Sequence, residues 1–338
     1  MQRKETPTES PAELNCRTYI RKAYEEKGFN EGAVNIILAA RAESTYKQYD
    51  SELKKWNKFC KERNLNSVDC NIISIIEFLT EQFHLGAKYG SLNSMRSALS
   101  LLYGTDLSNN QDLSLFFKGL YKLKPTTPKY THTWDINIVL KELESWHPTS
   151  SLSLKKLTRK LTMLLALGTA YRVQHLSLIK LANIRASSHG VEITITDITK
   201  TSKAGSVQPH AVLSFFKDKP ELCIAKCIIA YLNRTKEIRG EIPDLFITYQ
   251  NPHKRASRES ISRWIRTVLK ICKIDEIYSG HSTRHASTSK AFVCGLDTNV
   301  IKKSGCWSEN SKVFSKFYNR KIENSEKNFA EVVFDQIS

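Results

Sequence analysis

The stretch Gly280-His281-Ser282-Thr283-Arg284-His285 sets an arginine between two histidines at the expected start of a helix. Downstream, Gly305-Cys306-Trp307 is followed eleven residues later by Tyr318, and upstream Arg172 comes just after an apolar helical stretch. Guanidinium groups can bind an anion bidentately and stay ionised at any working pH. Arg172 and Arg284 are therefore candidates for binding a phosphate.

The charge of the chain also favours an anionic partner. The 338 residues include 51 lysines and arginines against 34 aspartates and glutamates, a formal net charge of +17. Such an excess calls for a polyanion, and nucleic acid is the commonest one. With 41% hydrophobic and 25% charged residues, the composition is that of a globular protein and excludes collagen-like and wholly disordered chains.

Neither a membrane-spanning helix nor a secretion signal is expected. No stretch approaches ~18 consecutive apolar residues, so we expect no membrane partner. The polar beginning of the chain lacks the apolar region of a signal peptide, and we expect residues 1–13 to be a disordered lead-in.

The positive charge is concentrated in the second part of the chain. Residues 1–130 carry 19 basic and 15 acidic side chains, whereas residues 131–338 carry 32 and 19. The segment 124–133 has two prolines and no apolar period, which is typical of a linker. We therefore expect a helical N-terminal domain over 14–123 and a second domain over 134–338.

The apolar periodicity predicts a mainly α fold with a small β-sheet. Near-alternation over 191–198 and 211–216 predicts a β-hairpin with a basic connecting loop. Elsewhere apolar residues recur at three- and four-residue steps, and Ser44 is a candidate N-cap. Helices are expected over 16–27, 32–40, 45–63, 72–83, 92–103, 112–122, 134–144, 154–169, 223–236, 257–270, 285–294, 298–303 and 325–337.

The ordered motifs resemble the tyrosine recombinases, which break and rejoin DNA. That family has an arginine, a hairpin lysine, a His-x-x-Arg box, a His or Trp after a glycine, and a tyrosine near the C-terminus. The resemblance covers nearly the whole chain: 44–121 looks like the all-helical core-binding (SAM-like) domain and 134–338 like the mixed α/β catalytic domain. The stretches 280–292 and 314–320 are most similar to recombinases of eukaryotic crypton and DIRS-like mobile elements, which implies a nuclear location; otherwise we expect a cytoplasmic one.

The resemblance assigns roles in phosphate binding. Arg172 and Arg284 would clamp the non-bridging oxygens, and His281 would add a hydrogen bond. Trp307 would donate its indole N–H to the phosphate or pack against the site. Preorganised donors of this kind commonly contribute ~2.7–4 kcal/mol each to lowering a barrier.

The resemblance also assigns the nucleophile and the general acid. Tyr318 would attack the phosphate and form a 3′-phosphotyrosyl link, helped by positive charge because the unperturbed pKa of tyrosine is about 10. Lys200, on the hairpin loop, would protonate the leaving 5′-oxygen, and Lys203 is the competing candidate. The resemblance implies no cofactor and no metal ion, because the bond energy is kept in the covalent adduct.

Supporting and DNA-contacting residues can also be named. His285 and His175 are expected behind the residues that touch the phosphate. His175 departs from the family pattern, since many members have an acidic residue three positions after the first arginine. Lys203 and a set of arginines with helical spacing are candidates for contacts to double-stranded DNA. These arginines are Arg255, Arg258, Arg263 and Arg266.

Several alternatives stay open at the sequence level. Each candidate has a structural reading: Trp307 and Tyr318 as packed aromatics, for example, and Arg172 as a charge at a helix C-terminus. The chain could also be an inactive, domesticated DNA-binding protein or a type IB topoisomerase-like enzyme. Cys223 and Cys227 could share a zinc site, but buried small apolar residues are favoured because no second pair accompanies them.

The assembly state follows from the last predicted helix. The helix expected over 325–337 has one apolar face, which needs a partner. In the family such a segment docks on a neighbouring protomer, so we expect a homo-tetramer on paired DNA sites. The alternative is that the helix packs on its own domain.

Overall fold

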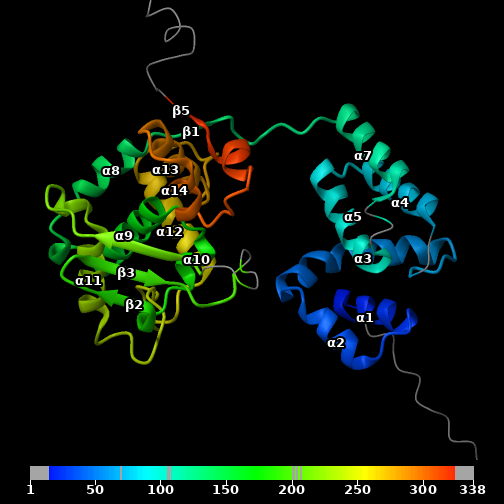
Figure 1. The fold of residues 1–338 in the computed structure, drawn as a ribbon, viewed down its shortest axis with the longest axis horizontal. Helices are drawn as coiled ribbons and strands as arrows, with labels where there is room; N and C mark the ends of the chain where they lie inside the picture. Colours follow the sequence, from blue (N-terminus) through cyan, green and yellow to red (C-terminus); the bar gives the residue numbers. More distant parts are fainter. Residues whose placement is uncertain are drawn as a thin grey trace, which may run out of the picture. The chain divides into compact units, whose positions relative to one another are not determined.

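The computed structural model describes residues 15–323 except 69–70, 105–106, 108, 200–201, 203–204 and 206–207. The chain divides into two compact units, Met1–Thr127 and Pro128–Ser338 (Figure 1). None of the described helices is both long and apolar enough to cross a membrane. The helix expected over 325–337 and the candidates Lys200 and Lys203 lie outside the described residues.

The first unit is helical, as expected. Asn15, Asn30, Asn71 and Asn110 each stand at an N-cap and accept a hydrogen bond from a backbone N–H three residues on, which fixes four helix starts. The expected cap at Ser44 is wrong, because the third helix begins at Glu43, with Ala42 at its N-cap. The helices are α1 (Cys16–Glu26), α2 (Glu31–Ala39), α3 (Glu43–Glu62), α4 (Ile72–His84), α5 (Tyr89–Tyr103) and α7 (Gln111–Leu123).

An aromatic cluster forms the centre of this unit. Trp56 is fully buried, stacks on Phe59 at 5.6 Å between ring centroids and meets Phe78 edge-on at 5.2 Å. Its indole N–H donates to the Ser67 carbonyl at 3.0 Å, so the polar atom of the ring is satisfied in the core.

The second unit is built around one buried helix. Helix α9 packs against α10, α11, α12 and α13 (Figure 1), and its leucines give it the broad apolar face that the sequence predicts. The helices are α8 (Ile136–Glu144), α9 (Leu154–Thr169), α10 (Val173–Ser177), α11 (Ile224–Thr235), α12 (Arg258–Ile271), α13 (Ser282–Val293) and α14 (Thr298–Ser304). Short 3-10 turns cover Thr149–Ser151, Leu181–Asn183 and Pro220–Leu222, and a π-helical turn, η4, covers Phe314–Tyr318.

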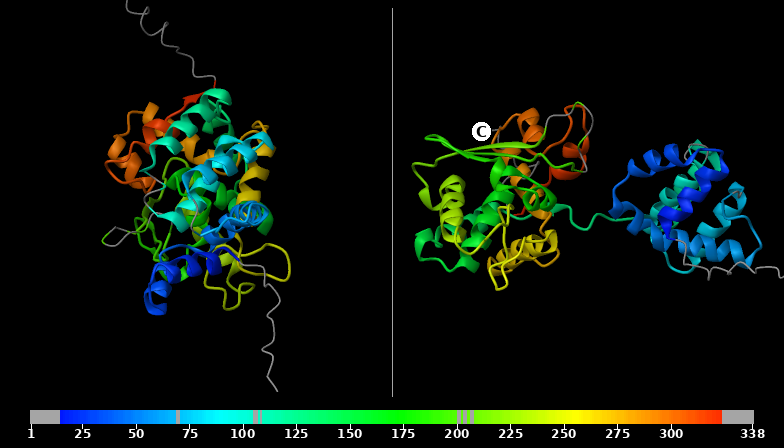
Figure 2. Two further views of the ribbon diagram at one scale, coloured as in Figure 1. Left: turned by 90° about the vertical axis from the view of Figure 1, so that its right-hand side faces the viewer. Right: turned by 90° about the horizontal axis from the view of Figure 1, so that it is seen from below.

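The predicted hairpin is part of a three-stranded antiparallel sheet in the order β2-β3-β4 (Figure 2). Strands β3 (Gly190–Thr194) and β4 (His210–Ser214) confirm the hairpin, although both end before the predicted limits. Strand β2 (Ile184–Ala186) was not predicted. At Gly190 a Cβ would lie 2.1 Å from the Leu213 carbonyl oxygen, so the close approach of β3 to β4 requires glycine there.

A second, two-stranded sheet joins distant parts of the chain. Strand β1 (His132–Thr133) pairs in parallel with β5 (Lys321–Ile322), and the Glu323 N–H donates to the Thr133 carbonyl at 2.8 Å. Both strands contact α13, and they lie beside α13 and α14 in Figure 1. This pairing places the chain that follows Tyr318 next to the beginning of the unit.

Candidate functional site

Tyr318 lies in a pocket of aromatic and basic side chains. It is the last residue of η4 and is 8% exposed. Its hydroxyl lies 2.8 Å from Nε2 of His281, and its ring stacks on His285 with centroids 4.4 Å apart. Trp307 meets the ring edge-on at 4.7 Å. The interval of eleven residues between Trp307 and Tyr318 therefore does not keep the tyrosine from the His-x-x-Arg box.

Arg284 is held in place by the backbone of two other segments. Its Nη1 donates to the Ala170 carbonyl at 2.5 Å, and its Nη2 donates to the Gly305 carbonyl. The guanidinium is fully buried and lies over the Trp307 ring, 3.7 Å from the centroid, in a cation–π contact. Ala170, with φ +52°, turns the chain at the end of α9 and so presents its carbonyl to Arg284.

Three buried N–H donors at this site have no acceptor. Within the described part of the chain, Nη1 of Arg172, Nε of Arg284 and Nε1 of Trp307 each have no hydrogen-bond partner. Arg172 stands at the N-cap of α10, and its charge acts on both His281 and Arg284. Buried donors are nearly always paired in proteins, so buried donors without acceptors suit an anionic ligand.

The histidines of the site are held in the neutral state. Burial, reinforced by the charges of Arg172 and Arg284, lowers the pKa of His175 to about 4. His281 is exposed as a whole residue, yet partial burial of its ring and the charges of Arg284 and Arg172 lower its pKa to about 4. Burial and the neighbouring His281 lower the pKa of His285 to about 4.

These pKa values predict a loss of stability in acid. An unfolded histidine titrates near 6.5 and the buried His175 near 4, so between these values the unfolded state binds the extra proton. The contribution of His175 to the free energy of unfolding, up to about 3 kcal/mol, is therefore fully present above pH 6.5. It is lost as the pH falls toward 4.

Thermal unfolding of wild type and His175→Gln between pH 7 and pH 5 checks this expectation. The variant should lose less stability than wild type over that interval, whatever its starting melting temperature. Equal losses in the two proteins would contradict a buried, neutral His175.

The predicted DNA-contacting arginines differ in their surroundings. Arg258, Arg263 and Arg266 are exposed on α12. Arg255 instead lies before that helix, with Nε 3.0 Å from the Asp244 carboxylate and Nη2 donating to the Ser177 carbonyl. Within the described structure, Arg255 is the one of these four arginines that forms a salt bridge.

Some residues of the pocket were missed by the sequence analysis. Ser289 donates to the Tyr318 carbonyl at 2.9 Å, and the ring of Tyr130 meets that of His285 edge-on at 5.6 Å. The carbonyls of Ala170 and Gly305 were also missed. A backbone carbonyl has no signature in the sequence, whereas the spacing of Ser289 from His281 and His285 on one helix was available.

The two spaced cysteines are buried, as favoured from the sequence. Cys223 and Cys227 are each 1% exposed, the Phe216 N–H donates to Sγ of Cys223, and burial raises the pKa of Cys227 to about 12. Across the described ranges, no three His, Cys, Asp or Glu side chains lie close enough to hold a metal ion.

The fold is that of the tyrosine recombinases. The XerH site-specific recombinase bound to its palindromic difH substrate has a TM-score of 0.61 and 12% identity over 93% of this chain and 94% of that chain. A lambda integrase dimer bound to a core site has a TM-score of 0.55 and 16% identity, over 92% of this chain and 97% of that chain. The Tn1549 transposon integrase in complex with circular-intermediate DNA has a TM-score of 0.52 and 12% identity, over 95% of this chain and 99% of that chain. No family model matches the chain, and no curated protein matches it either.

Proposed function

We propose that this protein is a site-specific DNA recombinase or integrase that cleaves and rejoins strands through a 3′-phosphotyrosyl intermediate. The observation that carries the proposal is the Tyr318 hydroxyl next to His281, beside the buried guanidinium of Arg284 and the donors of Arg172 and Trp307 that have no partner among the described residues. The similar solved structures are recombinases and integrases bound to DNA, which supports a DNA substrate.

The proposed reaction uses these groups in turn. The Tyr318 oxygen attacks the phosphorus while neutral His281, 2.8 Å away, accepts the phenolic proton. Arg172, Arg284 and Trp307 donate to the non-bridging oxygens as negative charge develops on them. The bond from phosphorus to the 5′-oxygen breaks, and that oxygen takes a proton from Lys200 or Lys203. Rejoining reverses these steps with a 5′-hydroxyl as nucleophile, so the phosphodiester is restored.

The expected result is a covalent protein–DNA adduct that depends on Tyr318. A library of labelled duplexes with randomised, nicked interiors would be incubated with the protein, and SDS-resistant adducts recovered and sequenced. Wild type should give adducts on a set of related DNA sequences. Tyr318→Phe should give no adducts, because it lacks the nucleophilic oxygen, but it should still bind DNA in gel-retardation assays.

Other outcomes would reject the proposal or change it. DNA binding without any adduct by wild type would favour an inactive, domesticated DNA-binding protein. Adducts that lead to relaxed supercoils but never to exchanged strands would favour a topoisomerase.

We further propose a mobile-element role and a nuclear site of action. The stretches 280–292 and 314–320, which are most similar to recombinases of eukaryotic mobile elements, support both. Recovered target sequences that match the ends of such an element in the host genome would support this role, and unrelated sequences would reject it.

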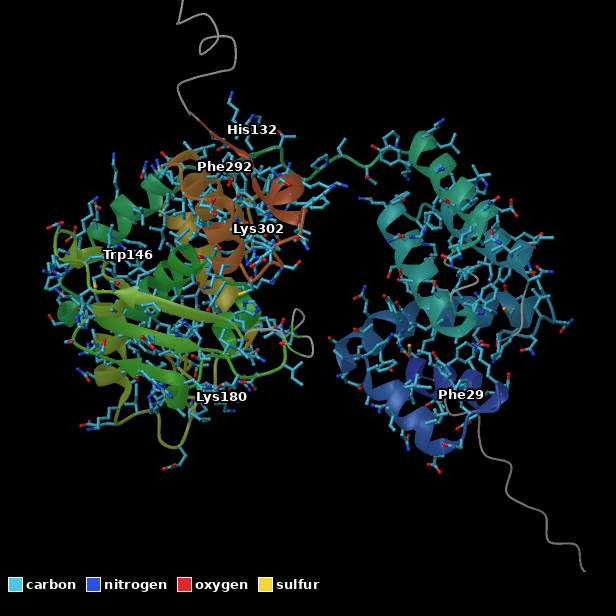
Figure 3. The ribbon with its side chains drawn as sticks, viewed as in Figure 1. Phe29, His132, Trp146, Lys180, Phe292 and Lys302 are labelled. Atoms are coloured by element: carbon cyan, nitrogen blue, oxygen red, sulfur yellow. The ribbon has the colours of Figure 1, made fainter. Side chains whose placement is uncertain are left out.

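We propose that the active form is a homo-tetramer on paired DNA sites. An apolar patch on the α13–α14 end of the second unit supports this assembly (Figure 3 labels Phe292 and Lys302 there). The patch consists of Phe292, Val293, Leu296 and Val300, which are between 41% and 65% exposed. Its proposed occupant is the segment 324–338 of a neighbouring copy, whose sequence predicts an amphipathic helix. One similar solved structure is a lambda integrase tetramer bound to a Holliday junction, with a TM-score of 0.50 and 14% identity.

Deleting residues 324–338 should leave cleavage of a single site intact but abolish assembly of two sites into one complex. The reason is that the deletion removes the proposed docking segment and leaves the described site whole. Adduct formation and sedimentation of the protein with paired-site DNA measure the two effects. Unchanged assembly would show instead that this segment packs on its own unit.

A further inference from the structure

Three side chains at the start of α13 and along it contact three different parts of Tyr318. His281 precedes α13 directly, and His285 and Ser289 follow at four-residue steps, so all three lie on one face. His281 bonds the hydroxyl, His285 stacks on the ring, and Ser289 donates to the backbone carbonyl of the same residue. The helix thus contacts the tyrosine from its reactive atom to its main chain.

The Ser289 hydroxyl uses both of its hydrogen-bonding functions on this segment. It donates to the Tyr318 carbonyl at 2.9 Å and accepts from the Arg320 N–H at 2.9 Å. The two backbone groups flank Asn319, so one hydroxyl fixes the turn by which the chain leaves the tyrosine. Ser289 is fully buried, and water does not compete for these bonds.

Besides Ser289, α13 bonds the backbone of this segment through His285, which meets Phe317, one residue before the tyrosine. Arg320 Nε bonds the Phe317 carbonyl at 3.0 Å, which is a contact within the segment itself. The pairing of β5 with β1 begins only at Lys321 and anchors the chain to a different element. Among the described residues, Ser289 is therefore the hydrogen-bonding link between the backbone of Tyr318 and the helix that carries His281 and Arg284.

We propose that Ser289 is a positioning residue for the nucleophile, an inference that rests on the proposed recombinase function. Because Ser289 fixes the main chain of Tyr318 to α13, it keeps the tyrosine hydroxyl next to His281 and Arg284. Without this link the tyrosine can shift along the helix, away from the in-line position that attack on phosphorus requires. A misplacement of this size is expected to slow cleavage ~10- to 100-fold.

The test compares three variants on a nicked duplex recovered by the adduct selection. Ser289→Ala removes the link and Ser289→Thr keeps the hydroxyl. Ser287→Ala is the matched control, because the Ser287 hydroxyl on the same helix has no hydrogen-bond partner among the described residues. Single-turnover cleavage at saturating DNA, the half-saturating DNA concentration and the melting temperature are measured for each.

Positioning predicts slow cleavage by Ser289→Ala at saturating DNA with an unchanged half-saturating concentration, since the Ser289 hydroxyl already uses both of its hydrogen-bonding functions on the segment that carries Tyr318. Ser289→Thr and Ser287→Ala should cleave at nearly the wild-type rate. The inference is overturned if Ser289→Ala cleaves as fast as Ser287→Ala. It is also overturned if Ser289→Thr is as slow as a Ser289→Ala protein that melts early, because packing alone would then explain the defect.

The two levels of the proposal can fail separately. If wild type forms no adduct at all, the recombinase function is wrong and the role of Ser289 falls with it. If wild type forms adducts and Ser289→Ala matches it, only the positioning role is wrong.

Discussion

Arg284→Lys is expected to slow DNA cleavage by roughly 10²–10³-fold, the effect of losing a preorganised donor at a developing negative charge. The wild-type guanidinium holds the Ala170 and Gly305 carbonyls with its two Nη atoms while lying over the Trp307 ring. A lysine ammonium is a compact charge without a planar fork, so it cannot reproduce both bonds and the stacked contact. The variant would keep the positive charge, but the charge would no longer lie where the guanidinium holds it.

Single-turnover adduct formation measures this effect, with gel retardation as the measure of binding. Arg185→Lys is the matched control, because Arg185 is exposed on β2 and is assigned neither to the site nor to DNA contacts. We expect the control to cleave at close to the wild-type rate. An Arg284→Lys protein within a factor of a few of wild type would show that charge alone is sufficient.

Gly305→Ala is expected to destabilise the second unit by about 1–3 kcal/mol, the usual cost of overpacking a tight site, and to slow cleavage. A Cβ at this position would lie 2.1 Å from Cζ3 and 2.4 Å from Cε3 of Trp307. The ring would have to move, although it lies on Arg284 and against Tyr318. A single methyl group would therefore disturb both the cation–π contact of Arg284 and the packing of Tyr318.

Chemical denaturation and adduct formation test this expectation, and a double variant locates the cause. The clashing atoms belong to the six-membered ring of Trp307, so Trp307→His should reduce the cost of adding Gly305→Ala. Gly119→Ala on α7 is the control, because a Cβ there meets nothing within 4 Å. It should slightly stabilise the first unit, by ~0.5–1 kcal/mol. An unchanged cost in the Trp307→His background would rule out the clash as the cause.

Much of the fold follows from local patterns in the sequence. The leucines over 154–169 predict the central helix α9 with both of its ends, because they recur at helical spacing and form a broad apolar face. Strand β2 was missed because its three residues are exposed or half-exposed and do not alternate. Strands β1 and β5 were missed because each has two residues, and their partners are 189 positions apart in the chain.

The candidate site was predictable in its side chains but not in its supports. Arg284, His281 and Tyr318 were found because their chemistry and order are distinctive, and the structure brings them together. The carbonyls of Ala170 and Gly305 are common to every residue, so only the fold shows which of them accept from Arg284. The start of α13 at Ser282, earlier than predicted, also escaped notice, because His281 at the N-cap forms no side-chain cap that a pattern would reveal.

The strand pair β1–β5 has a mechanical consequence. Thr133 and Ile322 are paired, and Ile322 lies four residues after Tyr318. Tension on the segment that joins the two units would act first on Tyr130, which packs on Tyr278 and His285, and then on the two-residue pair β1–β5. A load on that pair would pass through four residues of chain to Tyr318.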